Sequence, residues 1–293
     1  LKKDIIIACS YCEDIAKYFF YKNYNVYVIC LYQSLNLNKY SEKVFLFDSF
    51  SSKKLAKIVE QIDPKKKMNI LIGSGFSEKI RHKKILEGRK NFGNSHQTIT
   101  EVKSKKFFIY LKKNNIKHPK THINKLKSGN FLIKNYESFG TQNLTFYEKH
   151  KKLKKNEYFQ EFIDGDLISV QFLRKKKTHI LSICSQENIL KNKNFITDSL
   201  ITKNVNKNFF EKIKKLTEKI ASIFNLYGLN NLDLVIKDKN IFLIEVNPRP
   251  GLSFKIIERI NKKSIQSRNK FIISHNQKYF STTVVYAKKK NHF

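Results

Sequence analysis

Short apolar runs alternate with amphipathic stretches through the first third of the chain, and this alternation restricts the fold more than any other feature. Apolar runs of β-type composition occupy residues 3–8, 25–31, 44–47 and 69–72, while residues 13–21 and 52–61 have the apolar spacing of helices. Strands that alternate with helices in this way build a parallel sheet with helices on its faces. We therefore expect residues 1–97 to form an α/β domain around such a sheet.

The loops after two of these strands bear on ligand binding. The sequence Cys9-Ser10-Tyr11-Cys12 stands where a dinucleotide-binding domain would carry G-x-G-x-x-G. The strand at residues 69–72 ends in Gly73-Ser74-Gly75, at the edge where open α/β sheets place ligands, although a tight turn explains these glycines equally well. We expect a Rossmann-like domain without a dinucleotide fingerprint.

The remainder of the chain has the pattern of an α+β domain with mostly antiparallel strands. Helices are expected at residues 103–115 and 209–224, and strands at residues 130–134, 144–147, 157–163, 167–172 and 179–185. Two further strands, at residues 232–236 and 241–246, form a hairpin across a polar turn. The predicted fold class is therefore α/β plus α+β, with a second domain over residues 98–293.

The net charge of +34, from 58 Lys and Arg residues against 24 Asp and Glu residues, suggests an anionic partner. Only six of these basic residues are Arg, the side chain best suited to clamp phosphates and read bases. We interpret the charge as a solvated, Lys-rich surface, with nucleic-acid binding as the less favoured alternative. A hydrophobic content of 41% excludes a disordered basic tail.

No apolar run approaches the roughly 18 residues of a membrane-spanning helix. The apolar run near the N-terminus is too short for a signal peptide, so we expect a cytoplasmic protein with reduced thiols and no membrane partner. Cys9 and Cys12 have no second cysteine pair to complete a zinc site, and we expect buried thiols there. His82, His96 and His118 lack the spacing of metal ligands, and we place them on surface loops.

The hairpin near the end of the chain combines three oxygen-bearing side chains with an otherwise apolar sequence. Glu245 and Asn247 lie two residues apart on one strand and therefore share a face of the sheet. Asp233, on the opposing strand, can lie on that face too. Gathering these oxygens among apolar residues would be costly without a cation, and hard oxygen donors suit Mg²⁺. A cap or a salt bridge explains either acid alone, but the three together predict a metal site.

A second group of residues suits a nucleotide. Lys134 ends a predicted strand, and a loop with Gly140 follows. A Lys that projects from a strand can neutralise phosphate oxygens, and a glycine-bearing flap can close over them. The apolar segment around Phe162 can present backbone groups to an adenine edge. The order of the two groups along the chain is more informative than either group alone.

In this order the two groups resemble the ATP-grasp superfamily over residues 103–251, and the N-terminal region is similar to the domain that usually precedes it. Together with further segments they resemble a group of predicted ATP-dependent carboligases related to biotin carboxylase and associated with tetrahydromethanopterin-linked C1 metabolism. Those segments are Gly73-Ser74-Gly75-Phe76, Gly93-Asn94, Gln160 with Ile168-Ser169-Val170, Ser185-Gln186, Glu245-Val246-Asn247-Pro248-Arg249-Pro250 and Val285-Tyr286-Ala287.

The resemblance implies an ATP-dependent ligase that joins a small-molecule carboxylate to an amine. Two subdomains, at about residues 98–165 and 166–293, would grip ATP with two Mg²⁺ (or Mn²⁺) ions. The carboxylate would become an acylphosphate, the amine would attack it, and ADP and phosphate would leave. The reaction would belong to C1-cofactor biosynthesis of the methanopterin or methylofuran type. The resemblance implies nothing about the oligomeric state.

The resemblance also implies a role for each matching residue. Lys134 would contact the α- and β-phosphates, and Arg249 would stabilise the transferring phosphoryl group. The adenine hinge would be Gln160, Glu161, Phe162 and Ile163, the flap glycine Gly140, and the metal ligands Asp233, Glu245 and Asn247, with Glu245 between two ions.

Several positions depart from the superfamily pattern, among them the first phosphate-contacting Lys. Ser104 stands where the first phosphate-contacting Lys is expected, so Lys103, Lys105 or Lys106 has to replace it, with Lys105 as the candidate. Two other functions stay open. One is a nucleic-acid-binding protein with a degenerate ATP-grasp fold, and the other is a biotin-carboxylase-like enzyme that activates bicarbonate. The intact acidic group counts against the first, and nothing in the sequence resembles a biotinyl segment that would support the second.

Overall fold

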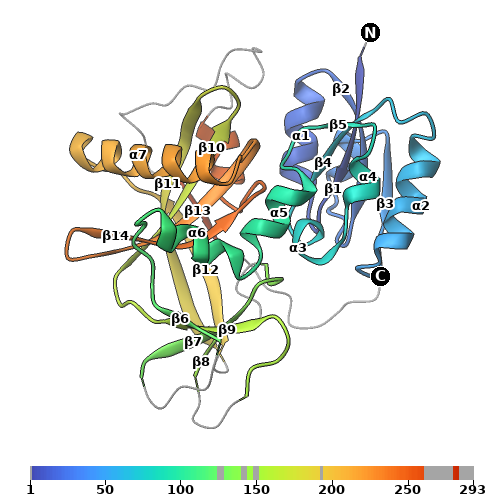
Figure 1. The fold of residues 1–293 in the computed structure, drawn as a ribbon. Coiled ribbons are helices and arrows are strands. Elements are labelled where there is room, and N and C mark those ends of the chain that lie inside the picture. The colour runs from blue at the N-terminus through green and yellow to red at the C-terminus, as the bar shows by residue number, and fades with distance from the viewer. Residues whose placement is uncertain are drawn as a thin grey trace.

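Two sheets, one parallel and one antiparallel, organise the chain (Figure 1). The computed structural model describes residues 2–123, 129–139, 144–147, 152–191, 194–260 and 280–283. Within these ranges, no helix has both the length and the apolar character that crossing a membrane requires.

The N-terminal sheet has five parallel strands in the order β3-β2-β1-β4-β5. The strands are β1 (Lys3–Ala8), β2 (Tyr24–Cys30), β3 (Lys43–Leu46), β4 (Asn69–Ile72) and β5 (Lys90–Asn91). Its helical elements are α1 (Glu13–Tyr21), η1 (Leu37–Tyr40), α2 (Ser52–Ile62), α3 (Phe76–Lys79) and α4 (Lys83–Leu86). The central strands are nearly all apolar because α1 packs on one face and α2 on the other. The parallel sheet expected from the sequence is present.

The helix expected at residues 103–115 is present as the shorter α6 (Lys106–Lys113), and α5 (His96–Val102), which the sequence did not predict, precedes it. Ser95 caps α5 through its hydroxyl, which accepts from the Thr98 N–H at 3.1 Å. The Ser104 hydroxyl binds the Glu101 carbonyl and accepts from the Lys106 N–H, and such local bonds compete with the helix. The proposed domain boundary after residue 97 falls within α5.

The second sheet has ten strands in the order β14-β13-β10-β11-β12-β8-β7-β9-β6, with β15 paired to β12. Its smaller part contains β6 (Thr121–His122), β7 (Phe131–Asn135), β8 (Thr145–Phe146) and β9 (Glu157–Glu161). Its larger part contains β10 (Asp166–Arg174), β11 (Thr178–Lys191), β12 (Asn194–Thr202), β13 (Gly228–Lys237), β14 (Asn240–Asn247) and β15 (Ser281–Thr283). All pairings between these strands are antiparallel, as expected, although the sequence did not predict β12.

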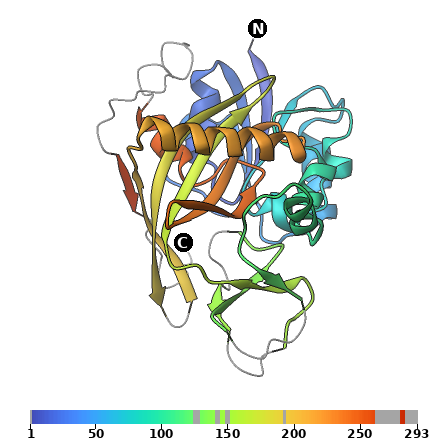
Figure 2. The same ribbon diagram turned by 60° about the vertical axis from the view of Figure 1, so that its left-hand side comes forward.

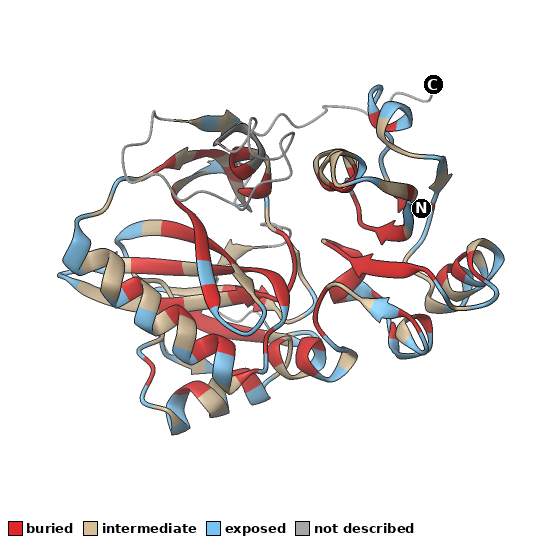
Figure 3. Cartoon of the chain, turned by 90° about the horizontal axis from the view of Figure 1, so that it is seen from above, coloured by how far each residue is buried: buried red, intermediate tan, exposed pale blue. Residues whose placement is uncertain are grey.

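The two faces of the larger part differ in polarity. Helices α6 and α7 (Lys207–Ile223) cover one face of this part (Figure 2). This face is apolar and includes Ile168 of β10 and Leu232 of β13. Because side chains alternate along a strand, the register partners Ser169 and Asp233 lie on the opposite face. Helix α8 (Phe254–Ile260) follows β14, and buried residues concentrate along the strands of both sheets (Figure 3). The polar face is the setting of the site described next.

Candidate active site

The hairpin of β13 and β14 brings the predicted metal ligands together. Asp233 and Glu245 are register partners, and the Asn247 amide donates to one carboxylate oxygen of Asp233 at 3.0 Å. The Asn231 amide donates to the other oxygen at 2.8 Å. Three oxygen-bearing side chains from two strands are therefore assembled on the polar face of the sheet.

A β-bulge in β14 directs Glu245 to this face. Strict alternation would put Leu243 and Glu245 on the same face, yet Leu243 and Val246 both belong to the apolar core. The register of the hairpin shifts at this point, so Ile244 is an additional residue in β14. The Gln160 side chain donates to the Ile244 carbonyl at 3.3 Å and supports the bulge.

Two lysines from separate elements reach Glu245. Lys103, between α5 and α6, places its Nζ 2.5 Å from Glu245 Oε1 and 3.1 Å from Asn247 Oδ1. Lys134, on β7, places its Nζ 3.3 Å from Glu245 Oε2. Both lysine side chains are largely buried, with 8% and 9% of their surface exposed. The larger and smaller parts of the second sheet therefore meet at this carboxylate.

Lys105, the candidate from the sequence for the first phosphate contact, lies elsewhere. It is exposed at the start of α6, whereas Lys103 reaches the acidic group. The reason is the break between the two helices, which leaves Lys103 in the connection that faces the sheet. We therefore replace Lys105 with Lys103 as the candidate.

Arg249 lies just beyond β14 and is buried. Its Nη2 donates to Asn247 Oδ1 at 3.3 Å, and its Nη1 donates to the Pro250 carbonyl at 3.1 Å. Its Nε donates to Glu78 Oε1 at 2.7 Å. Glu78 lies in α3, one of the helices of the N-terminal region. Glu78 was not predicted from the sequence, where its one signal is its position shortly after the Gly73-Ser74-Gly75 turn.

The charges at the site shift the pKa values of the two carboxylates in opposite directions. Burial alone would raise the pKa of Glu245, but the ammonium groups of Lys103 and Lys134 bring it down to about 2. Burial and the negative charge of Glu245 raise the pKa of Asp233 to about 6. Asp233 therefore loses its proton less readily than an ordinary carboxyl group, and a cation beside it would lower its pKa.

Mg²⁺ suits this donor set. Among the residues that the structure describes, no three His, Cys, Asp or Glu side chains gather into a metal cluster, so the site depends on two carboxylates and one amide. Mg²⁺ prefers such oxygen donors and needs only one or two protein carboxylates where phosphates supply further oxygens. Asp233, Glu245 and Asn247 therefore fit a magnesium ion that is shared with a phosphate-bearing ligand.

Comparison with known families decides the identity of the fold. The profile of the ATP-grasp domain matches residues 103–253, which is more than half of the chain. The chain belongs to the ATP-grasp family. The matched residues include Lys103, Lys134 and the whole β13–β14 hairpin. The resemblance to the ATP-grasp superfamily is confirmed.

Individual ATP-grasp proteins show the same relationship. Tyramine–L-glutamate ligase of Methanocaldococcus jannaschii is 29% identical over 204 residues, which cover 64% of this chain and 60% of that protein. The chain thus spans less than two thirds of this relative's length. L-amino acid ligase from Bacillus licheniformis has a TM-score of 0.71 at 18% identity, over 90% of this chain and 72% of that chain. The biotin carboxylase domain of Hydrogenobacter thermophilus 2-oxoglutarate carboxylase, solved with MgADP, has a TM-score of 0.68 at 15% identity. The match covers 87% of this chain and 66% of that chain. The two structures show a shared fold.

The residues that the ATP-grasp resemblance assigns to an adenine hinge lie at the end of β9 and directly after it. The backbone N–H groups of Glu161 and Phe162 donate to carbonyls of neighbouring segments at 2.8 Å and 2.9 Å. Gln160 is buried beneath the β14 bulge, and Ile163 is half-buried. Gly140, the expected flap glycine, lies outside the described residues.

Two other expectations concern cysteine and histidine. Cys9 and Cys12 are buried free thiols, as expected. The surface position expected for His82 is wrong, since this residue is buried with its Nδ1 2.7 Å from the Ile80 carbonyl. The His96 ring packs edge-on against the His82 ring at 5.0 Å. These two contacts hold the His82 ring in the interior, and the sequence spacing gave no sign of them.

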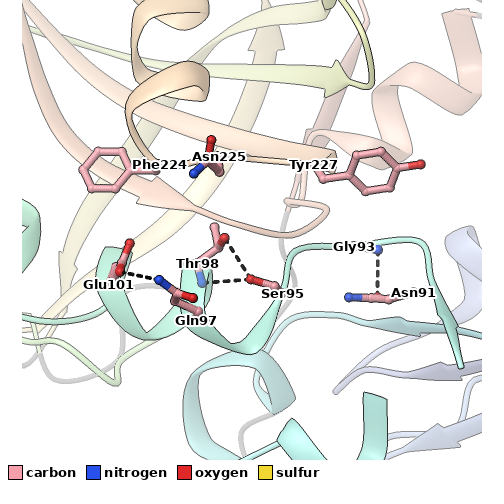
Figure 4. A pocket seen from close by; sticks show the side chains of 9 residues that line it. All are labelled: Asn91, Gly93, Ser95, Gln97, Thr98, Glu101, Phe224, Asn225 and Tyr227. Carbon is pink, nitrogen blue, oxygen red and sulfur yellow. Dashed lines mark hydrogen bonds between the residues drawn. The ribbon is translucent and has the colours of Figure 1, made fainter. Parts of the chain in front are cut away.

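A cavity of about 390 Å³ lies apart from this site, between α5 and the connection from α7 to β13 (Figure 4). None of the candidate active-site residues lines it, so it is a separate feature. Its lining consists of Asn91, Gly93, Ser95, Gln97, Thr98, Glu101, Phe224, Asn225 and Tyr227.

Proposed function

We propose that the chain is an ATP-dependent ligase that joins a carboxylate to an amine and releases ADP and phosphate. One observation carries the proposal: the ligand group of Asp233, Glu245 and Asn247 lies beside the buried Lys103 and Lys134 in a chain of the ATP-grasp family. A metal-binding acid group next to phosphate-binding cations is what phosphoryl transfer requires.

The nucleotide would lie between the two parts of the second sheet. Lys103 and Lys134, which come from either side, would bind its phosphate oxygens, since buried ammonium groups attract phosphate strongly. Residues 160–163 would form the adenine hinge. Asp233, Glu245 and Asn247 would hold Mg²⁺, with Glu245 between two ions. When bound, Mg²⁺ neutralises charge on the β- and γ-phosphates.

The reaction would proceed in two steps. A carboxylate oxygen attacks the γ-phosphorus, the bond from this phosphorus to the bridging oxygen breaks, and ADP leaves with the electron pair. The amine nitrogen then attacks the carbonyl carbon of the acylphosphate, the bond from this carbon to the phosphate oxygen breaks, and inorganic phosphate leaves with the proton that the nitrogen loses. The guanidinium of Arg249 would stabilise charge that develops on the transferring phosphoryl group. Positioning and charge neutralisation account for this chemistry without a dedicated general base.

The relatives support a finer proposal about the substrates. The tyramine–L-glutamate ligase relative, at 29% identity, favours an amino-acid carboxylate and a primary amine as the two substrate classes. A place in C1-cofactor biosynthesis is supported by the sequence resemblance. Neither the carboxylase-like nor the nucleic-acid-binding alternative is favoured by a specific observation in the structure.

The first test is ATP binding by thermal shift, with and without Mg²⁺, on wild type and Glu245→Gln. A ligand that binds only the folded state raises the unfolding temperature, so wild type should show a Mg²⁺-dependent rise that the variant loses. Asp238→Asn is the matched control, because Asp238 is an exposed acid in the turn of the same hairpin. A Mg²⁺-dependent rise in Glu245→Gln equal to that in wild type would contradict the metal assignment. ADP release with glutamate and tyramine then tests the reaction.

A further inference from the structure

The side chain of Glu78 is completely buried between the two sheets, and each of its oxygens has partners. One oxygen accepts from the Gly75 N–H at 2.8 Å and from the Ser77 hydroxyl at 2.6 Å. The other accepts from Arg249 Nε at 2.7 Å. A single carboxylate thus links a turn of the N-terminal sheet to the arginine beside the candidate metal ligands.

The turn that carries Glu78 is fixed by its sequence. Gly75 has a φ of +84°, a conformation that favours glycine. A Cβ at this position would also lie 1.9 Å from the hydroxyl of Ser10, which follows β1. The turn is therefore held by close packing behind it and by the Glu78 carboxylate in front. Glu78 has little freedom to move away from Arg249.

The contact with Glu78 sets the orientation of the Arg249 guanidinium. This group is planar, so fixing Nε at Glu78 and Nη1 at the Pro250 carbonyl also fixes the direction of Nη2. Nη2 then points at Asn247 Oδ1, 3.3 Å away. The edge of Arg249 that faces the candidate metal site is therefore positioned from the opposite side by Glu78.

Glu78 also balances charge. Arg249, Lys103 and Lys134 bring three cations to one buried region, and Asp233 and Glu245 supply only two acids. Glu78 is the third acid. Without it the guanidinium would be buried next to two ammonium groups without a carboxylate partner of its own, which is costly and favours a shift of the side chain toward Glu245.

We propose that Glu78 is a positioning residue of the active site, which acts on the reaction through Arg249. The N-terminal sheet is on this basis part of the catalytic centre rather than a separate binding module. This inference rests on the proposed ligase function.

The experiment compares Glu78→Gln with Asp63→Asn. Asp63 and Arg89 form another buried ion pair, at 2.8 Å, within the N-terminal sheet region. Loss of this ion pair in Asp63→Asn should lower the unfolding temperature without moving Arg249. Steady-state ADP release with an acid and an amine gives kcat, and KM for ATP is measured alongside.

In Glu78→Gln we expect kcat to fall by roughly 10²-fold, as for other small misplacements of catalytic groups, while KM for ATP changes little. Glu78→Asp keeps the charge on a shorter side chain, so its kcat should lie between the values for Glu78→Gln and wild type. Asp63→Asn should keep the kcat of wild type below its unfolding temperature. Equal kcat values in Glu78→Gln, Asp63→Asn and wild type would overturn the proposal. If Glu78→Gln does not fold, the Asp variant decides by the same comparison.

A second readout separates this proposal from the ligase function. Only six arginines contribute Nε–H signals to an NMR spectrum, and Arg249→Lys identifies the one from Arg249. That N–H should exchange slowly in wild type and in Asp63→Asn, and quickly in Glu78→Gln. Unchanged exchange in Glu78→Gln would overturn the positioning role whether or not the protein releases ADP. Absence of ADP release in wild type, with the exchange result as expected, would count against the reaction alone.

Discussion

At the scale of single residues, Asp233 and Glu245 face each other across one hairpin but have pKa values displaced in opposite directions. Lys103 and Lys134 both form ion pairs with Glu245, so this carboxylate keeps its charge. Among the residues that the structure describes, the donors to Asp233 are the amides of Asn231 and Asn247. Asp233 is therefore the ligand whose ionisation a metal ion has to promote.

The pH dependence of Mg²⁺ binding follows from this asymmetry. A proton competes with the cation for Asp233 below its pKa of about 6, so the Mg²⁺-dependent thermal shift should grow as the pH rises through about 6. Without Mg²⁺ the sign is opposite. The folded-state pKa lies above the ordinary value of 3.8, so the stability due to Asp233 is complete below 3.8 and is lost as the pH rises through about 6. Asp233→Asn should remove both effects. A Mg²⁺-dependent thermal shift that stays constant with pH would contradict the prediction.

Lys103 and Lys105 provide a second test at this scale. Lys103→Ala should weaken ATP binding by roughly tenfold or more, because it removes a buried cation that faces the acidic group. Lys105→Ala should leave the affinity almost unchanged, since Lys105 is exposed at the start of α6. Titration calorimetry of Mg²⁺-ATP on both variants makes the comparison. If Lys105→Ala weakened ATP binding more than Lys103→Ala, Lys105 would again be the candidate for the phosphate contact.

At the scale of secondary-structure elements, the bulge in β14 decides where Glu245 points. The bulge carbonyl, on Ile244, accepts a hydrogen bond from the buried Gln160 of β9. Gln160→Leu should leave this carbonyl without its side-chain donor and destabilise the fold by about 1–3 kcal/mol. It should also weaken the Mg²⁺-dependent thermal shift, because Glu245 follows the bulge directly. A loss of stability with an unchanged Mg²⁺ response would show that the bulge does not depend on Gln160.

The elements also show what the sequence could predict. Apolar periodicity gave the parallel strands of the N-terminal sheet, because both of its faces are buried and its strands are continuously apolar. The spacing of Glu245 and Asn247 predicted a shared face, and the structure has it. The bulge at Ile244 could not be predicted, since an inserted apolar residue does not change the composition of an apolar strand. Glu78 was missed, and Lys103 could not be singled out from Lys105 and Lys106, because the partners of both residues lie far away in sequence.

At the scale of the whole molecule, the two sheets are joined by a buried polar contact besides the one at Glu78. The Asn94 amide donates to Asn230 Oδ1 at 2.7 Å and to the Pro248 carbonyl at 2.8 Å. Its oxygen accepts from the Tyr227 N–H at 2.8 Å. Asn94 follows β5, and its partners lie within β13 (Asn230), just before β13 (Tyr227) and just after β14 (Pro248). Three hydrogen bonds from one buried side chain therefore bind the N-terminal sheet to the hairpin that carries the candidate metal ligands.

We therefore expect the sheets to unfold together, with one transition in calorimetry. Asn94→Ala should lower the free energy of unfolding by about 2–4 kcal/mol, because it leaves several buried polar groups without partners. Asn25→Ala is the control, since Asn25 binds Asp4 within the N-terminal sheet alone and should cost at most about 1 kcal/mol. Two separate transitions in wild type would contradict this expectation. The sheets would then be independent bodies, and a carboxylate on one of them could not hold an arginine on the other in a fixed orientation.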